Sequence, residues 1–199
     1  MSFRIEQKLL INSTQIFTFR KWLNQKDYKK LYNDRLVNSL YFENISNSMF
    51  LDSEEGIIPR KKIRVRNYPQ NKLEEFFLEN KISSPEGRLK EKKKITKEEL
   101  DKIKKVGYSD NLYSSCHPKL YVTYYREYYN CNGSRLTIDT NISYKDYQNK
   151  NLLRKDTSIA VEIKTNVNHN LDDLLRQFPF QRVRFSKYSK AFISLYNNI

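Results

Sequence analysis

Residues 60–68, with the sequence RKKIRVRNY, alternate between cationic and apolar side chains. Every second residue from Lys62 to Arg66 is a cation, and Ile63 and Val65 lie between them. Because successive side chains of a strand point to opposite faces, this period of two predicts a strand with one cationic and one apolar face. Any fold of this chain must place the cationic face of this strand either against water or against an anionic ligand.

The same alternation recurs along the chain and predicts a mainly β protein of the α+β class. The expected strands cover residues 4–10, 36–43, 60–68, 74–83, 87–95, 119–130, 134–143 and 158–165. Eight such strands suit a closed antiparallel β-barrel with flanking helices on its outside. A sandwich of two sheets is the alternative architecture.

Helices are expected between and after these strands, over residues 13–24, 96–105, 171–178 and the C-terminal stretch. Thr96 and Glu99 have the spacing of a capping box, which marks the start of the second helix. Ser186 is the expected N-cap of the last helix. The apolar residues that follow it fall on one helical face: Tyr188, Ala191, Phe192 and Leu195.

The charge balance points to an anionic partner. The chain of 199 residues has 37 Lys and Arg against 23 Asp and Glu, which gives a formal net charge of +14. This much like charge disfavours a compact state through self-repulsion unless a partner offsets it. A hydrophobic content of 38% with 14% aromatic residues excludes a disordered basic tail. The N-terminus lacks a signal-peptide pattern and no apolar run reaches transmembrane length, so a soluble, cytoplasmic domain is expected.

The acidic residues of the predicted strands follow a repeated arrangement. Three Glu-x-Lys triplets begin at Glu6, Glu79 and Glu162, and each places a carboxylate and an ammonium on the same face of a strand. For a single strand, a charged row indicates a solvated face. Cations dominate the rows of several strands, however, and like charges opposite each other are destabilising. A polyanion bound with a metal ion inside a charged barrel would explain the set.

These rows belong to a series of motifs in a particular order: Arg4-x-Glu6-x-Lys8, Val37-Asn-Ser-Leu-Tyr-Phe42, Lys62-Ile-Arg64-Val-Arg66-Asn-Tyr68, Glu79-Asn-Lys81, Arg126, Arg135-Leu-Thr-Ile-Asp139, Glu162-Ile-Lys164 and Phe185-Ser-Lys-Tyr188. Their order and spacing resemble those of VTC-type polyphosphate polymerase domains, within the triphosphate tunnel metalloenzyme superfamily. The resemblance covers essentially the whole chain. It implies a single domain over residues 1–199 with an eight-stranded tunnel barrel. In that family the tunnel binds a nucleoside triphosphate and a divalent metal, and the γ-phosphate passes to a growing polyphosphate chain.

The residue chemistry agrees with this resemblance, because phosphoryl transfer depends on cations that position and neutralise the transferred group. Guanidinium forks can grip phosphate oxygens bidentately. The residues expected to be catalytic are Arg64, Arg66, Lys81, Arg126, Arg135 and Lys187. Those expected to bind phosphate are Lys8, Lys62, Lys90, Lys164 and Ser186. Mg²⁺ or Mn²⁺ prefers hard oxygen ligands. The metal candidates are Glu162 first, then Glu6 and Glu79, of which the last two could equally serve as partners of neighbouring cations.

One departure separates the chain from the phosphatases of the CYTH branch. Those phosphatases are recognised by the pattern Glu-x-Glu-x-Lys on the first strand. In this chain Arg4 stands in place of the first acid. The replacement favours polymerisation over hydrolysis. A triphosphatase of the same fold and a non-catalytic binder of polyphosphate or nucleic acid are the alternatives.

The expected partners are a nucleoside triphosphate and polyphosphate. Tyrosines around Arg126, in YYREYY, could form a stacking platform for single-stranded nucleic acid. The chain has no recognised nucleic-acid-binding motif, so nucleic acid is not the favoured partner. Family polymerases can work alongside membrane-spanning proteins, so a membrane partner is left open although the chain shows no span of its own.

Overall fold

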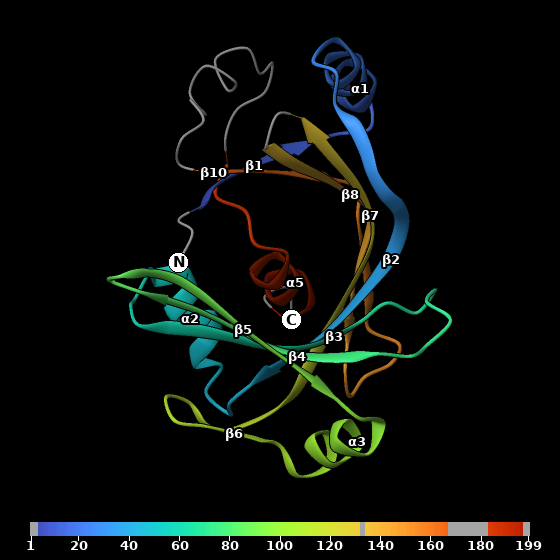
Figure 1. Ribbon diagram of the computed structural model, residues 1–199. Helices are drawn as coiled ribbons and strands as arrows, with labels where there is room; N and C mark the ends of the chain where they lie inside the picture. The colour runs from blue at the N-terminus through green and yellow to red at the C-terminus, as the bar shows by residue number, and fades with distance from the viewer. Residues whose placement is uncertain (1–3, 132–133, 167–182, 197–199) are drawn as a thin grey trace. The chain divides into compact units, whose positions relative to one another are not determined.

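The computed structural model describes residues 4–131, 134–166 and 183–196 (Figure 1). The described helices are α1 (Gln15–Gln25), α2 (Ser48–Glu55), α3 (Lys97–Val106) and α5 (Lys187–Tyr196). The strands are β1 (Arg4–Ile11), β2 (Lys29–Glu43), β3 (Arg60–Asn67), β4 (Phe76–Ser84), β5 (Gly87–Ile95), β6 (Tyr108–Asp110), β7 (Ser114–Cys131), β8 (Ser134–Asp146), β9 (Leu153–Asp156) and β10 (Ile159–Asn166). The helix expected over residues 171–178 lies outside the described part of the chain.

The strands pair in the order β1-β10-β8-β7-β2-β3-β4-β5, with β6 added beside β7 and β9 beside β8. The protein is therefore mainly β, as expected, with one ten-stranded sheet and antiparallel pairing in the registers described. β1 and β5 stand at the two ends of this order, and within the described residues no pairing joins them. The closed eight-stranded barrel expected from the sequence is thus not confirmed.

The eight predicted strands all appear, but three elements were missed. β6 and β9 have three and four residues, too few for alternation to be recognised. α2 has the sequence SMFLDSEE, which lacks a clear apolar period. β2 begins at Lys29, well before the predicted start, because its first six residues are all exposed and carry no apolar alternation.

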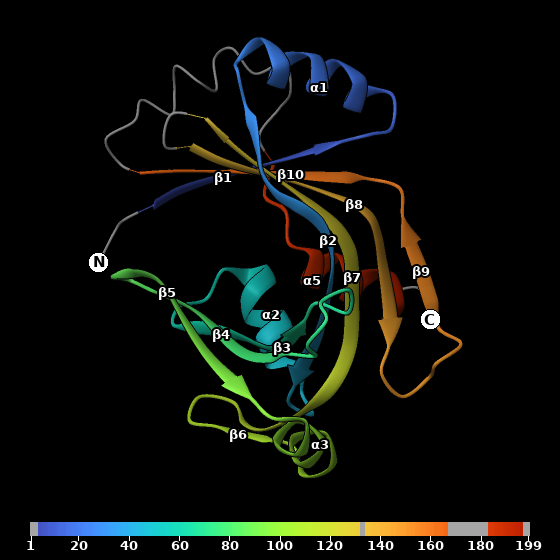
Figure 2. The same ribbon diagram turned by 45° about the vertical axis from the view of Figure 1, so that its right-hand side comes forward.

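The chain divides into two compact units, which we describe separately. The first comprises residues 1–35, 124–142 and 155–185. In it, helix α1 covers the apolar face of β1, β8 and β10 (Figure 2). Trp22 of α1 packs within the core between these elements. The buried core consists of Leu9, Ile11, Phe19, Trp22, Leu23, Tyr28, Leu136, Ile138, Ile159, Val161 and Ile163.

The second unit comprises residues 36–123, 143–154 and 186–199. Its core contains Ile63 and Val65 of β3 together with residues of α2, α3, β4 and β7. The predicted capping box of α3 is confirmed, since the Thr96 side chain accepts from the Glu99 N–H and the Glu99 side chain accepts from the Thr96 N–H. Ser186 caps α5, and its Oγ accepts from the Ser189 N–H at 3.3 Å.

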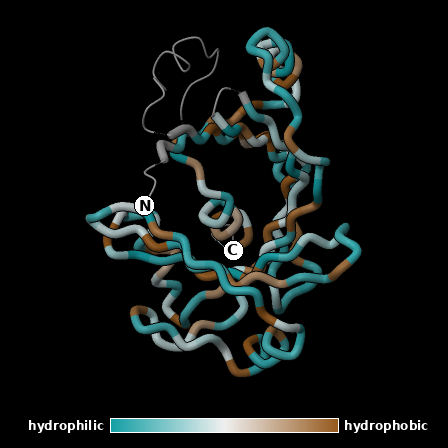
Figure 3. The backbone as a smooth tube through the Cα atoms, in the orientation of Figure 1, coloured by the Kyte–Doolittle hydropathy of each residue, from teal (hydrophilic) through white to brown (hydrophobic). Residues whose placement is uncertain are grey.

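Both faces of β3 are buried in this second unit. Ile63 and Val65 are 0% and 4% exposed, whereas Arg64 and Arg66, on the opposite face, are 6% and 7% exposed. Hydrophilic and hydrophobic stretches follow one another along the backbone of the sheet (Figure 3). The cationic face of RKKIRVRNY therefore does not meet water as an ordinary wet face would.

In the described parts of the chain, no helix combines the length and the apolar character needed to cross a membrane.

Candidate functional site

Arg64 is the centre of the buried polar network in the second unit. The pairing of β3 with β4 places it opposite Glu79. Its Nε and Nη2 donate to Glu79 Oε2 at 2.9 and 2.6 Å, and its Nη1 donates to the Tyr41 hydroxyl at 2.8 Å. The guanidinium is thereby fixed in one orientation by a carboxylate and a phenol.

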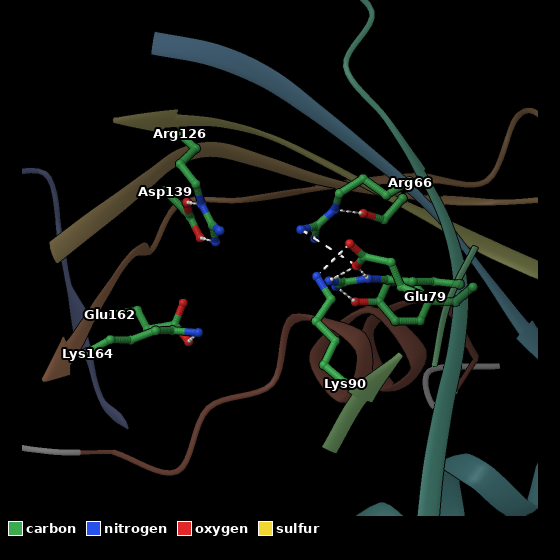
Figure 4. A network of polar contacts seen from close by, with 10 residues as sticks. Arg66, Glu79, Lys90, Arg126, Asp139, Glu162 and Lys164 are labelled. Atoms are coloured by element: carbon green, nitrogen blue, oxygen red, sulfur yellow. Dashed lines mark hydrogen bonds and ion pairs between the residues drawn. The ribbon is translucent and has the colours of Figure 1, made fainter. Parts of the chain in front are cut away.

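Glu79 is shared by three cations (Figure 4). Besides Arg64, Lys90 donates from Nζ to Glu79 Oε1 at 2.6 Å, and Arg66 Nη1 lies 4.0 Å from Oε2. Burial opposes ionisation, but Arg64, Arg66 and Lys90 outweigh it and lower the pKa of Glu79 to about 2. One carboxylate against three cations leaves a formal excess of two positive charges in this cluster.

A row of three lysines crosses β3, β4 and β5 in register. Lys62 pairs with Lys81, and Lys81 pairs with Lys90. Lysines directly opposite one another are unfavourable in a sheet. Lys62 Nζ donates to Ser186 Oγ at 3.0 Å, at the start of α5. The row and the start of this helix therefore lie together on the face that carries Arg64.

Tyr41 is a member of this network that sequence reasoning missed as a site residue. It lies opposite Arg64 in the β2–β3 pairing, stacks on Tyr188 at 4.9 Å and is 6% exposed. Burial alone would raise the pKa of its hydroxyl. The positive charges of Arg64, Arg66 and Lys187 outweigh burial, so the pKa lies below its ordinary value. The motif from Val37 to Phe42 contains Tyr41, but its place beside Arg64 follows from the register with β3, and register is not readable from one strand.

In the first unit, Arg126 of β7 and Asp139 of β8 form a bidentate pair. The distances are 2.6 Å from Nε to Oδ1 and 2.7 Å from Nη2 to Oδ2 (Figure 4). Burial disfavours the charged guanidinium, but Asp139 more than offsets this and raises the pKa of Arg126 well above its ordinary value. Arg126 thus remains a fixed cation on this face.

Two of the Glu-x-Lys triplets meet in the same unit. The antiparallel pairing of β1 with β10 places Glu6 opposite Lys164 and Lys8 opposite Glu162. Lys164 Nζ lies 3.2 Å from Glu6 and 3.3 Å from Glu162, and Lys8 Nζ lies 3.3 Å from Glu6. These four side chains form an alternating quartet of charges.

Glu162 is held ionised within this quartet. Its burial opposes ionisation, but the cations Lys164, Arg126 and Lys8 keep its pKa well below the ordinary value. Arg135 lies opposite Lys164 in the β8–β10 pairing and is half-buried. The charged face of the first unit thus carries four of the predicted cations.

The predicted site residues therefore fall into two groups. Those of the first unit are Glu6, Lys8, Arg126, Arg135, Glu162 and Lys164, and those of the second are Lys62, Arg64, Arg66, Glu79, Lys81, Lys90, Ser186 and Lys187. Arg64, Arg66 and Glu79 are buried, Lys81 and Lys90 are exposed, and the other described members are half-buried. Their roles in binding and catalysis stay predictions.

The metal candidates differ in how well their surroundings suit a cation. Both oxygens of Glu79 are already engaged by Arg64 and Lys90, which leaves it poorly suited. Glu6 and Glu162 are neighbours and together offer hard oxygen donors, and Mg²⁺ can be held by one or two carboxylates plus substrate phosphates. Within the described residues, no group of three or more His, Cys, Asp or Glu side chains could hold a metal ion alone.

The fold is similar to several solved structures. A candidate adenylate cyclase from Bacillus halodurans is 15% identical, with a TM-score of 0.60 over 93% of this chain and 94% of that chain. A candidate adenylyl cyclase from Hippeastrum, described as having a dominant triphosphatase activity, is 16% identical with a TM-score of 0.60 over 96% and 95%. A chain of the Schizosaccharomyces pombe Mediator head module is 11% identical with a TM-score of 0.55 over 92% and 99%. At these identities the similarity concerns the fold alone.

No curated protein matches the chain in sequence. The family comparison is more informative, because it covers nearly the whole chain. The model of the VTC domain matches residues 3–196. The protein therefore belongs to the VTC domain family, as the order of its motifs predicted.

Proposed function

We propose that this VTC domain is a polyphosphate polymerase, which transfers the γ-phosphate of ATP or another nucleoside triphosphate to a growing polyphosphate chain. The observation that carries the proposal is the burial of Arg64 and Arg66, which share the single carboxylate Glu79 with the exposed Lys90. Buried charge is costly unless it is compensated. A bound chain of phosphates would bring further anionic charge to these cations.

The fixed arginines suit the chemistry of phosphoryl transfer. Tyr41 and Glu79 orient Arg64 before any substrate arrives, and Asp139 does the same for Arg126. Preorganised cations stabilise the charge that develops on the transferred group without reorganising at the moment of reaction. In each unit these groups would bind and align phosphate oxygens and would not form a covalent intermediate.

A divalent metal fits this proposal at Glu162 and Glu6. Bound there together with substrate phosphates, Mg²⁺ or Mn²⁺ would neutralise phosphate charge. Glu79 is better assigned as the structural partner of Arg64 and Lys90.

A triphosphatase is the second candidate. The observation that favours it is the similarity in fold to the Hippeastrum protein, for which a triphosphatase activity is described. Both reactions require the same grip on a triphosphate. They differ in whether the acceptor is a phosphate chain or water.

The test follows the fate of the γ-phosphate. Purified protein is incubated with γ-labelled ATP and Mn²⁺ or Mg²⁺, and the label is measured in long polyanion and in free phosphate. We expect a ladder of chains, reduced roughly a hundred-fold by Arg64→Ala, because a preorganised donor to the reacting phosphates is lost. Arg64→Lys, which keeps the charge beside Glu79 but not the guanidinium fork, should also be strongly impaired.

The matched control is Arg154→Ala, an exposed arginine of β9 that should leave synthesis unchanged. Circular dichroism and thermal melting establish that each variant is folded. Label released only as orthophosphate would assign the protein as a triphosphatase. Full synthesis by a folded Arg64→Ala variant would contradict the proposed role of the buried arginines.

A further inference from the structure

A third arginine of the first unit, Arg35 of β2, lies against two aromatic rings. Its guanidinium carbon is 5.5 Å from the centroid of Tyr32 and 5.1 Å from that of Tyr128. The two rings meet edge to face, with centroids 5.6 Å apart and an interplanar angle of 80°. We call these three residues the Tyr32 cluster.

The Tyr32 cluster adjoins the charged face of the first unit. On β7, Glu127 is paired with Arg20 of α1 at 2.7 Å and Tyr129 packs against the apolar core, so these two residues face the helix. Arg126 and Tyr128 alternate with them and lie on the opposite face. Two residues of a strand span roughly 7 Å, so Tyr128 places the cluster beside Arg126.

Exposure separates Tyr32 from the other tyrosines of this face. Tyr124, over which the Arg126 guanidinium lies at 5.1 Å, is 3% exposed, and Tyr128 is 8% exposed. Tyr32 is 49% exposed. Tyr32 therefore retains ring surface on which another planar group can stack.

Arg35 is suited to a second contact. A guanidinium that stacks through its plane on aromatic rings still directs N–H groups outward from its edge. Those N–H groups can meet phosphate oxygens bidentately. The cluster thus joins a stacking surface to a cation that lies beside the arginine of the proposed phosphate path.

We propose that the Tyr32 cluster binds the nucleoside of the triphosphate substrate, with the base stacked on Tyr32 and the adjoining phosphate held by Arg35. The inference rests on the proposed function. A polyphosphate chain has no planar group, so an exposed ring beside the arginines serves a nucleotide and not the product. Because every base has a π-face, stacking of this kind tolerates ATP and GTP alike.

The test compares ATP with inorganic tripolyphosphate, which shares the phosphates but has no base. Binding of each is measured by titration calorimetry with EDTA present, so that no turnover occurs. We expect Tyr32→Ala to weaken ATP binding about ten-fold and to leave tripolyphosphate binding within about two-fold. Tyr32→Phe, which keeps the ring, should bind ATP like the wild type.

The matched control is Tyr125→Ala. Tyr125 is a 38% exposed tyrosine on the opposite face of β7, and its loss should change neither affinity. Equal weakening of ATP and tripolyphosphate by Tyr32→Ala, or unchanged ATP binding, would overturn the inference and leave the proposed polymerase intact. A wild-type protein that binds neither ligand would also overturn this inference, whereas a lack of both chain synthesis and phosphate release in the γ-label assay would overturn the proposed function.

Discussion

At the scale of single residues, Glu79 is the carboxylate that offsets the positive charge of Arg64, Arg66 and Lys90 in the second unit. Its side chain is 2% exposed and contacts Arg64 and Lys90 at 2.6 Å each. Removing one partner of a buried ion pair leaves an uncompensated charge and costs several kcal/mol, about 3–5. The folded state therefore depends on this carboxylate remaining ionised.

The pKa of Glu79 predicts a loss of stability in acid. Its folded-state value, about 2, lies below its ordinary value of 4.5. The stabilisation is thus fully present above pH 4.5 and is lost as the pH falls towards 2, and it amounts to roughly 3 kcal/mol. Denaturant unfolding between pH 7 and pH 3 should show this decline in the wild type and a shallower one in Glu79→Gln.

Glu75→Gln is the control for that series. Glu75 pairs with Lys94 at 2.7 Å at the surface, where an ion pair contributes little. This variant should follow the wild type at every pH. Parallel pH profiles for the wild type and Glu79→Gln would contradict the role assigned to Glu79.

At the scale of elements, antiparallel pairing explains why the Glu-x-Lys triplets recur. When two such strands run in opposite directions, the register found for β1 and β10 places each Glu opposite a Lys. Opposite charges across a strand pair are favourable. The triplets of β1 and β10 thus compensate each other across the strand pair, whereas Glu79 of the third triplet lies opposite Arg64 of β3 and Lys92 of β5.

The start of α3 provides a prediction at this scale. Thr96→Ala removes the hydroxyl that accepts from the Glu99 N–H, and the loss of such a cap costs about 1 kcal/mol. Thr14→Ala is the matched control, because Thr14 stands at the N-cap of α1 without a side-chain cap bond. Denaturant midpoints should fall for Thr96→Ala and fall less for Thr14→Ala. Equal effects would show that the capping bond contributes nothing of its own.

At the scale of the whole molecule, the charge balance determines how the protein responds to anions. The formal net charge is +14, and each compact unit carries its own network of predicted phosphate-binding cations. Self-repulsion among these charges opposes the folded state, and a ligand that binds only the folded state stabilises it.

Tripolyphosphate should therefore raise the melting temperature, and the rise should shrink as NaCl screens the charges. The measurement is thermal unfolding with increasing tripolyphosphate at low salt and again at 0.5 M NaCl. NaCl matched in ionic strength to each tripolyphosphate sample is the control for general screening. An equal rise with NaCl alone would contradict specific binding of the polyanion.

Much of the fold and of the candidate site follows from local patterns in the sequence. Alternation located the eight main strands, and the Thr96–Glu99 spacing located the start of α3. The alternating cations of β3 also predicted that Arg64 and Arg66 share one face. Each of these inferences needs only neighbouring residues, because side-chain direction in a strand and capping in a helix are set within a few positions.

The three-dimensional arrangement depended on contacts between distant segments. The pairing of Tyr41 with Arg64, the placement of Arg35 beside Tyr128 and the open strand order in place of a closed barrel all join residues far apart in the chain. Alternation places a side chain on a face but does not specify the partner strand or the register. Those are fixed by burial and charge pairing summed over the whole sheet.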